Sequence, residues 1–391
     1  MDRVAFSQSP VGQLIPIEGY DPRHQREYRH VAFCPTPLPE QVELQPETWV
    51  VVTQAMGWLG RLDQASRQVP NPALLRRPAI RKEAVSTSAL EGTHAAFTDV
   101  LQAEADRDVS HRSPEVVEIL NYVSAAEYAF DSVLARGLTV GLLSELQAIL
   151  VQGTPAEKQD AGRIRTHQVL IGPETCPVEE ARFVPPPHGD LLESGFRQWE
   201  RWVATTRDMP SVVQAALAHY QFETLHPYHD GNGRIGRLAV ALQLMLLGDL
   251  QEPLLTVSPW LERRREEYQD RLLEVSRTGD FDQWVRFFCN AIWAQAEQTV
   301  QKIDELLSLR SEIAARIREV PIRGVGQQIA EDLIGQPVTT PTYASDLYNV
   351  SYPAANQAIA RLVDLGLLKE LTGRNYGRMF GCRRVIDILD A

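Results

Sequence analysis

The chain has 391 residues, of which 44% are hydrophobic, and this length suffices for about two to three domains with real cores. A net charge of −12 disfavours non-specific nucleic-acid binding as its main task, since that task needs clustered cations. The sequence does not begin with a charged segment followed by an apolar run, and its apolar runs are far shorter than the ~20 residues of a membrane span. The spacing of the four cysteines indicates neither disulfides nor a zinc site: Cys34, Cys176, Cys289 and Cys382. We therefore expect a cytoplasmic protein.

The N-terminal third predicts an arm followed by three helices. Residues 1–50 are rich in proline and polar residues and have no sustained hydrophobic period, so we expect an irregular or extended wrapping arm. Apolar residues three and four apart predict a helix from about Trp49, a second over 78–105 and a third over 113–135. Ser113 as N-cap and a proline at the next position support the start of the third.

The middle of the chain interrupts the helical pattern once. Residues 163–185 predict a β-hairpin, because apolar residues alternate on both sides of a polar Gly-Pro connection. These residues are Ile164, Val169 and Ile171 before the connection, and Ala181, Phe183 and Val184 after it. Helical patterns then return and continue through one or two long amphipathic helices that begin at Phe281.

The C-terminal segment, from about Pro321, has a different organisation. Three short helices are followed by strand-like ends around a Gly-rich turn, which is the order of a winged helix-turn-helix. The third helix would present Asn356, Gln357 and Arg361. DNA recognition and a protein-interaction or dimerisation role both stay open, because acidic and basic residues are nearly equal in this segment.

The densest chemistry in the chain lies at 226–237, HPYHDGNGRIGR. Its GNGRIG matches the glycine pattern of dinucleotide-binding folds, but that pattern requires a preceding strand, and the flanking residues here have a helical period. The GxxxxGK[ST] phosphate loop does not occur in the chain either. The glycines are therefore expected in a loop between two helices, where the second helix begins.

Such a loop suits a phosphate group, because unpaired N–H groups and the helix dipole point at the anion. Arg234 and Arg237 are three apart and can bind outer phosphates from one side. Asp230 can hold Mg²⁺ and His226 can deprotonate a hydroxyl. Each residue alone has an ordinary structural explanation, whereas together they indicate transfer at phosphorus to a substrate hydroxyl, since the motif has no nucleophile of its own.

HPYHDGNGRIGR resembles the signature HxFx(D/E)GNGRxxR of Fic-domain proteins, with Tyr228 at the usual phenylalanine. The resemblance implies a mainly α-helical Fic fold and transfer of AMP from ATP, with Mg²⁺, to a hydroxyl of a target protein or of the chain itself. It also implies roles for the individual residues. His226 would be the general base and Asp230 the Mg²⁺ ligand, with Gly231, Asn232 and Gly233 around the α-phosphate and Arg234 and Arg237 on the β- and γ-phosphates.

Two further segments resemble Fic proteins. The helix that includes Thr87, Glu91 and Gly92 is similar to the inhibitory motif (S/T)xxxE(G/N), which implies that Glu91 pairs with Arg237 in place of the γ-phosphate. A plain helix-surface acid is the alternative for Glu91. Residues 163–185 resemble the family's flap, which implies that a target protein docks there. Tyr268 fits either a contact with the nucleotide base or a place in the core.

We therefore predict three parts: an N-terminal arm and helical region with the inhibitory helix (1–110), a Fic catalytic core with a β-hairpin flap (111–300), and a linker helix with a winged-helix domain (301–391). The predicted activity is a protein adenylyltransferase that Glu91 auto-inhibits. Removal of AMP from a target, and a DNA-binding regulator that senses nucleotide with its Fic core, stay as alternatives. The target, the acceptor residue type and homodimerisation stay open.

Overall fold

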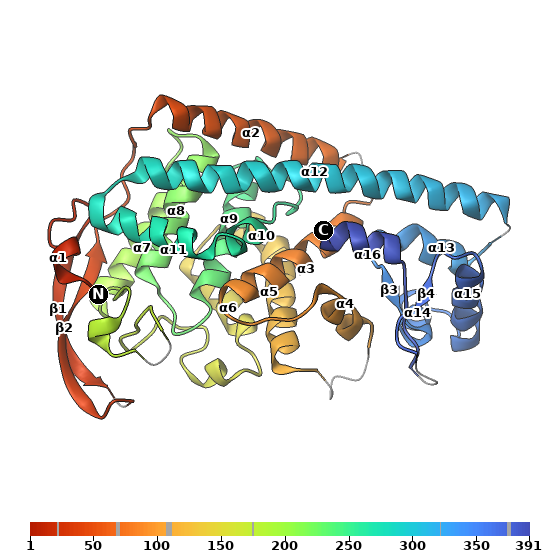
Figure 1. The fold of residues 1–391 in the computed structure, drawn as a ribbon, viewed down its shortest axis with the longest axis horizontal. Helices are drawn as coiled ribbons and strands as arrows, with labels where there is room; N and C mark the ends of the chain where they lie inside the picture. The colour runs from red at the N-terminus through yellow and green to blue at the C-terminus, as the bar shows by residue number, and fades with distance from the viewer. Residues whose placement is uncertain (22, 68–70, 107–111, 174–175, 321, 374–376) are drawn as a thin grey trace. The chain divides into compact units, whose positions relative to one another are not determined.

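The computed structural model describes residues 1–21, 23–67, 71–106, 112–173, 176–320, 322–373 and 377–391, and it is mainly helical (Figure 1). The chain divides into two compact units. The first comprises Met1–Gly60, Ser124–Gln251 and Trp260–Ala294, and the second comprises Arg61–Val123, Glu252–Pro259 and Gln295–Ala391. Helices α2 (Pro46–Arg67), α5 (Pro114–Arg136) and α12 (Phe281–Glu319) each contribute residues to both units.

The first unit begins with a β-hairpin that the sequence did not predict. A short helix α1 (Arg3–Phe6) precedes strands β1 (Gly12–Asp21) and β2 (Arg26–Pro35), which pair antiparallel from Gly12↔Pro35 to Asp21↔Arg26. The Asp21 carboxylate accepts the N–H groups of Arg23 and His24 and so closes the turn. The arm was predicted as irregular or extended, and the structure shows the extended form as a paired hairpin. Its strand pattern is weak in the sequence because Gly12, Pro16 and Gly19 in β1 hide the period of two.

This hairpin packs against residues 176–184 of the predicted flap. The rings of Phe6, Phe33 and Phe183 meet with centroids 5.4 to 6.0 Å apart, and the Phe33 N–H donates to the carbonyl of Val184 at 2.9 Å. The flap itself contains a single antiparallel bridge, Ile171↔Phe183, and a short 3₁₀ turn η3 (Val178–Glu180). The predicted antiparallel pairing is therefore present, in a shorter form than expected, and residues 174–175 lie outside the described part.

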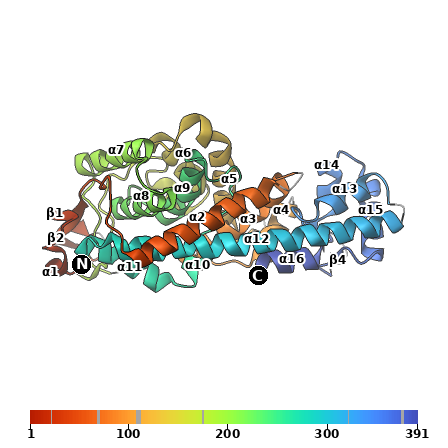
Figure 2. The same cartoon turned by 90° about the horizontal axis from the view of Figure 1, so that it is seen from above.

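Four helices of the first unit pack against one another and include the two that the motif loop joins (Figure 2). They are α6 (Val140–Leu150), α7 (Asp190–Thr205), α8 (Ser211–Leu225) and α9 (Asn232–Leu246), and a 3₁₀ turn η2 (Pro155–Lys158) follows α6. Helix α8 is buried along its length, including polar residues such as Gln214, His219 and Gln221. The indoles of Trp199 and Trp284 donate to the carbonyls of Ala218 and Ala216 at 2.8 and 2.7 Å, which fixes α8 within the core. Helices α10 (Ser258–Glu262) and α11 (Arg265–Thr278) follow.

In the second unit, the helix predicted over 78–105 is two helices, α3 (Ala73–Leu90) and α4 (Phe97–Ala105). Gly92 has φ +96, and the N–H groups of Gly92 and Thr93 donate to the carbonyls of Ala89 and Ser88, both at 3.0 Å. This is the Schellman arrangement that ends a helix at a glycine. The single-helix prediction was wrong because the apolar period resumes after a turn of only a few residues.

The C-terminal part of the second unit contains the predicted short helices and a small sheet. The helices are α13 (Val325–Asp332), α14 (Pro341–Leu347) and α15 (Tyr352–Asp364). Strand β3 (Val338–Thr339) lies between α13 and α14, and strands β4 (Lys369–Glu370) and β5 (Phe380–Gly381) follow α15. The three strands form an antiparallel sheet in the order β3-β5-β4. The strand-like ends predicted around the Gly-rich turn are present as β4 and β5, but the last residues of that segment form a helix, α16 (Arg383–Asp390), whose Val385, Ile386 and Leu389 are buried.

This C-terminal part is fastened to α3 and α4 by a buried arginine. Arg81, 4% exposed, lies 2.5 Å from the carboxylate of Glu104 and donates to the carbonyl of Gly335 and the amide oxygen of Gln336, both at 3.1 Å. Lys82 on the same helix pairs with Asp390 at 3.1 Å. Helices α3 and α4 thus belong to one packed body with the small sheet and its helices.

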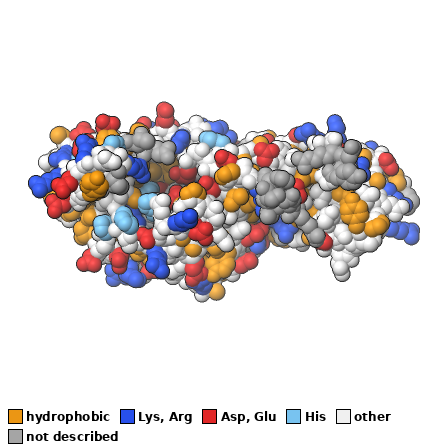
Figure 3. Space-filling view, turned by 90° about the horizontal axis from the view of Figure 1, so that it is seen from below, with side chains coloured by type: hydrophobic (Ala, Val, Ile, Leu, Met, Phe, Trp, Pro, Cys, Tyr) orange, Lys and Arg blue, Asp and Glu red, His pale blue; other side chains and the backbone are white. Residues whose placement is uncertain are grey.

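Two surface features bear on the predicted partners and location. On the face in Figure 3, acidic and basic side chains are interspersed among the described residues. In the described part of the chain, none of the helices has both the length and the apolar character needed to cross a bilayer. Helix α15 exposes Gln357 and Arg361 and half-buries Asn356, so the predicted DNA contact stays a prediction.

Candidate active site

His226 lies where helix α8 ends. Its backbone is left-handed, with φ 48 and ψ 61, and its N–H donates to the carbonyl of Phe222 at 2.9 Å. A left-handed conformation costs a residue with a Cβ roughly 1–2 kcal/mol. The chain therefore turns sharply at His226 and leads directly into the glycine loop.

Asn232 closes that loop through its side chain. Its amide oxygen accepts the N–H of Tyr228 and its amide nitrogen donates to the carbonyl of Tyr228, both at 2.8 Å. Tyr228 is fully buried; its hydroxyl lies 3.3 Å from that of Ser144, and its ring meets that of Phe196 edge-on. The structure thus gives the Asn232 side chain a loop-closing role, and a ring at position 228 suits this core.

The loop then opens helix α9. Gly231 is the N-cap with φ +83, and a Cβ there would lie 2.6 Å from Cδ2 of Leu150, so both the backbone angle and the available space require glycine. No side chain caps this helix end. The first-turn N–H groups, which include that of Gly233, are the kind of donors that bind a phosphate.

Arg234 lies on the first turn of α9 and Arg237 on the second, and they are 4% and 2% exposed. Arg234 lies 3.4 Å from the carboxylate of Asp230. The charge of Arg237 acts on His219, whose pKa falls to about 3, mainly because of burial and then because of this cation. His219 also lies 2.7 Å from the hydroxyl of Tyr268. Both are buried, so His219 is a core histidine and the core interpretation of Tyr268 is confirmed.

Two residues that the sequence did not single out brace the motif loop. Gln147 on α6 donates to the carbonyl of Asp230 at 3.1 Å and accepts the N–H of Gly162 at 2.6 Å. Arg165 donates to the carbonyl of His226 at 2.9 Å, and its own N–H donates to the carbonyl of Pro227 at 2.9 Å. The sequence gave no sign that Arg165 is buried, because an arginine in a polar segment is ordinarily exposed.

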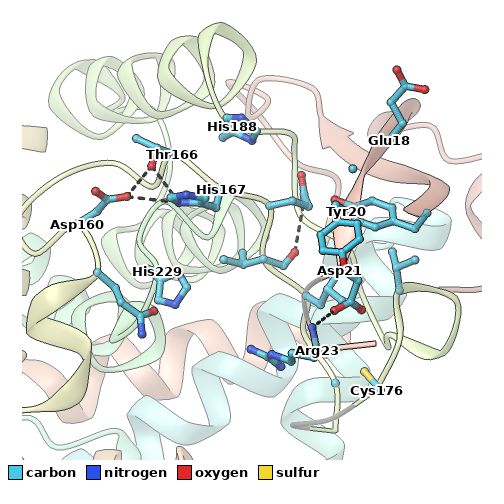
Figure 4. Close-up of a pocket in the computed structure, with 18 of the residues that line it drawn as sticks. Glu18, Tyr20, Asp21, Arg23, Asp160, Thr166, His167, Cys176, His188 and His229 are labelled. Carbon is cyan, nitrogen blue, oxygen red and sulfur yellow. Dashed lines mark hydrogen bonds and ion pairs between the residues drawn. The ribbon is translucent and has the colours of Figure 1, made fainter. Parts of the chain in front are cut away.

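A groove of about 920 Å³ lies beside the loop (Figure 4). Strand β1 and the turn after it form one wall with Tyr20, Asp21 and Arg23, and the flap lines the groove with residues 166–170. His229 of the motif lines it as well, and burial lowers the pKa of this half-buried histidine. Asp160 accepts a hydrogen bond from Thr166 at 2.7 Å within the same groove.

Comparison with known proteins places this site in a family. Residues 49–131 match the model described as Fic/DOC family N-terminal, and residues 137–244 match the Fic/DOC family model itself. The chain belongs to the Fic/DOC family. The N-terminal hairpin of this Fic protein lies outside both matched ranges.

Among its relatives, the protein adenylyltransferase Fic of Drosophila yakuba is 29% identical over 223 residues, and that of Drosophila melanogaster is 28% identical over the same length. These matches cover 54% of this chain but only 41% of either relative. A solved Fic family protein from Desulfovibrio desulfuricans G20 shares the fold, with a TM-score of 0.58, 21% identity and coverage of 88% of this chain and 98% of its own. Fic-1 (residues 134–508) from C. elegans aligns with a TM-score of 0.51, 20% identity and coverage of 68% and 75%.

The predicted inhibitory residues lie in the second unit. Thr87 is buried within α3, Glu91 is the C-cap of that helix, and Gly92 makes the left-handed turn. The glycine of the Fic inhibitory pattern is thus also the residue that ends α3. The predicted pairing of Glu91 with Arg237 stays a prediction.

Proposed function

We propose that this Fic protein transfers AMP from ATP to a hydroxyl group of a protein. The observation that supports this most is the loop that joins α8 to α9. It holds a turn-constrained histidine, a helix N-terminus without a side-chain cap, and two buried arginines on the first two turns of that helix. A base beside an anion-binding helix end is what transfer of a phosphorus group to a hydroxyl requires.

In the proposed reaction, the hydroxyl oxygen of the target attacks the α-phosphorus of ATP. The bond between that phosphorus and the bridging oxygen breaks, pyrophosphate leaves, and the hydroxyl proton passes to His226. The N–H groups of the first turn of α9, Gly233 among them, are expected to hold the α-phosphate. Arg234 and Arg237 would hold the outer phosphates through charge-assisted bonds, because both are held in place by burial.

The donor set fits a magnesium ion carried by the nucleotide. Asp230 has a half-exposed carboxylate, and among the described residues there is no cluster of three His, Cys, Asp or Glu that would form an all-protein cage. Mg²⁺ commonly binds one or two carboxylates and takes its other ligands from phosphates and water. Asp230 would hold the ion, which neutralises phosphate charge when bound.

Two finer proposals concern control and substrate. Glu91 is proposed to inhibit transfer by competing with the γ-phosphate for Arg237, which the match of Thr87, Glu91 and Gly92 to the Fic inhibitory pattern supports. The flap is proposed to hold an extended segment of the target, as its position along the groove beside His229 suggests.

The test is label transfer from ATP to protein, comparing the α-³²P and γ-³²P forms with the chain alone and in cell extract. We expect only the α-label to be incorporated, and more of it in Glu91→Gly. Transfer of the γ-label alone would replace the proposal with phosphotransfer. Loss of α-label from a previously labelled protein, dependent on Glu91, would instead favour the reverse reaction.

A further inference from the structure

Arg165 is a buried cation that joins three separate segments. It is 1% exposed, and each of its three guanidinium nitrogens donates to a backbone carbonyl. Nε reaches His226 at 2.9 Å, Nη1 reaches His167 at 3.1 Å, and Nη2 reaches Pro186 at 2.6 Å. One side chain thus bridges the motif loop and both ends of the flap.

The partners of Arg165 are unusual for a buried arginine. Among the described residues, no carboxylate lies within ion-pair distance of it, and its burial lowers its pKa to about 10. A buried charge is costly unless it is satisfied, and here neutral carbonyls alone provide the hydrogen bonds. We infer that this cation has a function that depends on its planar guanidinium group, which donates hydrogen bonds in three directions and which lysine cannot replace.

The carbonyl of His226 shows what that use is. His226 occupies a left-handed conformation at the end of α8, where the last carbonyls of a helix lack intrahelical partners. Arg165 binds this carbonyl from the side chain and the next one, that of Pro227, from its backbone N–H at 2.9 Å. These two bonds together fix the two peptide units that follow His226, while the His226 N–H bond to the carbonyl of Phe222 fixes the unit before it.

We propose that Arg165 is a positioning residue that fixes the position of the general base relative to the target-binding flap. The guanidinium holds the backbone of His226 on one side and closes the base of the flap, at His167 and Pro186, on the other. A target segment held by the flap is thereby presented to a base whose position is fixed by the same side chain. This role rests on the proposed transfer of AMP.

The experiment uses Arg165→Lys, Arg165→Met and Arg165→Ala, with Arg201→Ala as the control because Arg201 is an exposed arginine on α7, outside the flap and the motif loop. Incorporation of α-label into the protein itself is measured with these variants in the wild-type or the Glu91→Gly background, whichever incorporates more label. ATP·Mg²⁺ affinity is measured by calorimetry, and exchange of backbone amides is followed by mass spectrometry.

We expect incorporation to fall by roughly 10²-fold in Arg165→Lys and Arg165→Met, since small misplacements of a base have effects of this order. ATP affinity and the thermal midpoint should change little in Arg165→Lys, amide exchange should rise together in the flap and at 226–231, and added guanidinium should partly restore Arg165→Ala. Arg201→Ala should behave as wild type.

Full incorporation in Arg165→Lys would overturn the proposal, and so would a loss of ATP binding and thermal stability in proportion to the loss of rate. Amide exchange does not depend on activity. If no variant incorporates α-label but exchange rises together in both segments, the proposed function fails while the coupling by Arg165 stands. If exchange rises in only one segment, the coupling fails.

Discussion

Two of the segments that resemble Fic proteins, the inhibitory motif and the motif loop, each end a helix with a left-handed residue, but they do so by different means. Helix α3 ends at Gly92, φ +96, and two backbone hydrogen bonds to Ala89 and Ser88 complete the turn. Helix α8 ends at His226, φ 48, and its turn depends on Arg165, which is 61 positions away in the sequence. In the second turn, a distant side chain donates to the backbone carbonyl of the left-handed residue itself.

This difference separates a turn that changes chain direction from a turn that aims a functional group. Glycine makes the first turn at no steric cost. A histidine in the second accepts roughly 1–2 kcal/mol of strain, which the surrounding bonds offset. Substitutions around the end of α3 should therefore mainly lower the free energy of unfolding, and substitutions in the motif loop should mainly lower the rate of transfer.

The largest effect on stability is expected at Arg81, which links α3 to Glu104 on α4. Arg81→Met should lower the free energy of unfolding by about 3–5 kcal/mol, because it leaves the Glu104 carboxylate without its buried cation. Chemical denaturation would measure this. Glu104→Leu added to Arg81→Met should recover part of the loss, and a single variant that costs under about 1 kcal/mol would show that this pair does not anchor the helix.

The motif loop should instead respond in rate. His226→Asn keeps a residue that tolerates the left-handed backbone, so the fold should persist while transfer of α-label falls about 10²-fold or more. His229→Ala is the comparison, since His229 lines the groove three positions later. If both variants lose activity equally, or if only His229→Ala does, His226 is not the base.

The two glycines give a direct contrast in stability. Gly92→Ala meets open space and should cost only the left-handed strain, about 1–2 kcal/mol. Gly231→Ala adds an overlap with Leu150 and should cost about 1–3 kcal/mol more. Urea unfolding of the two variants in parallel measures the difference, and equal costs would contradict the close packing of the motif loop against α6.

The last effect concerns the pH dependence of stability and develops only in acid. The folded pKa of His219 is about 3, below its ordinary value of 6.5, so the unfolded chain takes up a proton that the folded chain refuses. Stability from this group is complete above pH 6.5 and should fall by about 1.4 kcal/mol per pH unit as the pH drops towards 3. His219→Gln should flatten the slope between pH 6 and 4 relative to wild type, whereas identical slopes would show that His219 titrates normally.

The helical fold and the motif loop were predictable because their signals are local. The apolar periods predicted α2, α5, α8 and α9, and a dozen consecutive residues specified the loop between α8 and α9. The site residues themselves keep the roles predicted for them as proposals, although the side chain of Asn232 is now seen to close the loop.

What escaped prediction depends on contacts distant in sequence. The β1–β2 hairpin contains Gly12, Pro16 and Gly19, which weaken a strand pattern, and it is packed on Phe183 of the flap, about 150 positions later. Arg165 and Gln147 look like surface residues in sequence, and only the folded chain shows that their polar atoms are taken up by backbone carbonyls and N–H groups of other segments.

The most direct test of the proposed AMP transfer is the intact mass of Glu91→Gly after incubation with ATP and Mg²⁺, with Glu91→Gly/His226→Asn alongside. An adduct with the mass of AMP on the first protein, absent from the second, is the predicted result. A phosphate adduct, an AMP adduct that persists in the double variant, or no adduct on the chain or on any protein of a cell extract would contradict it.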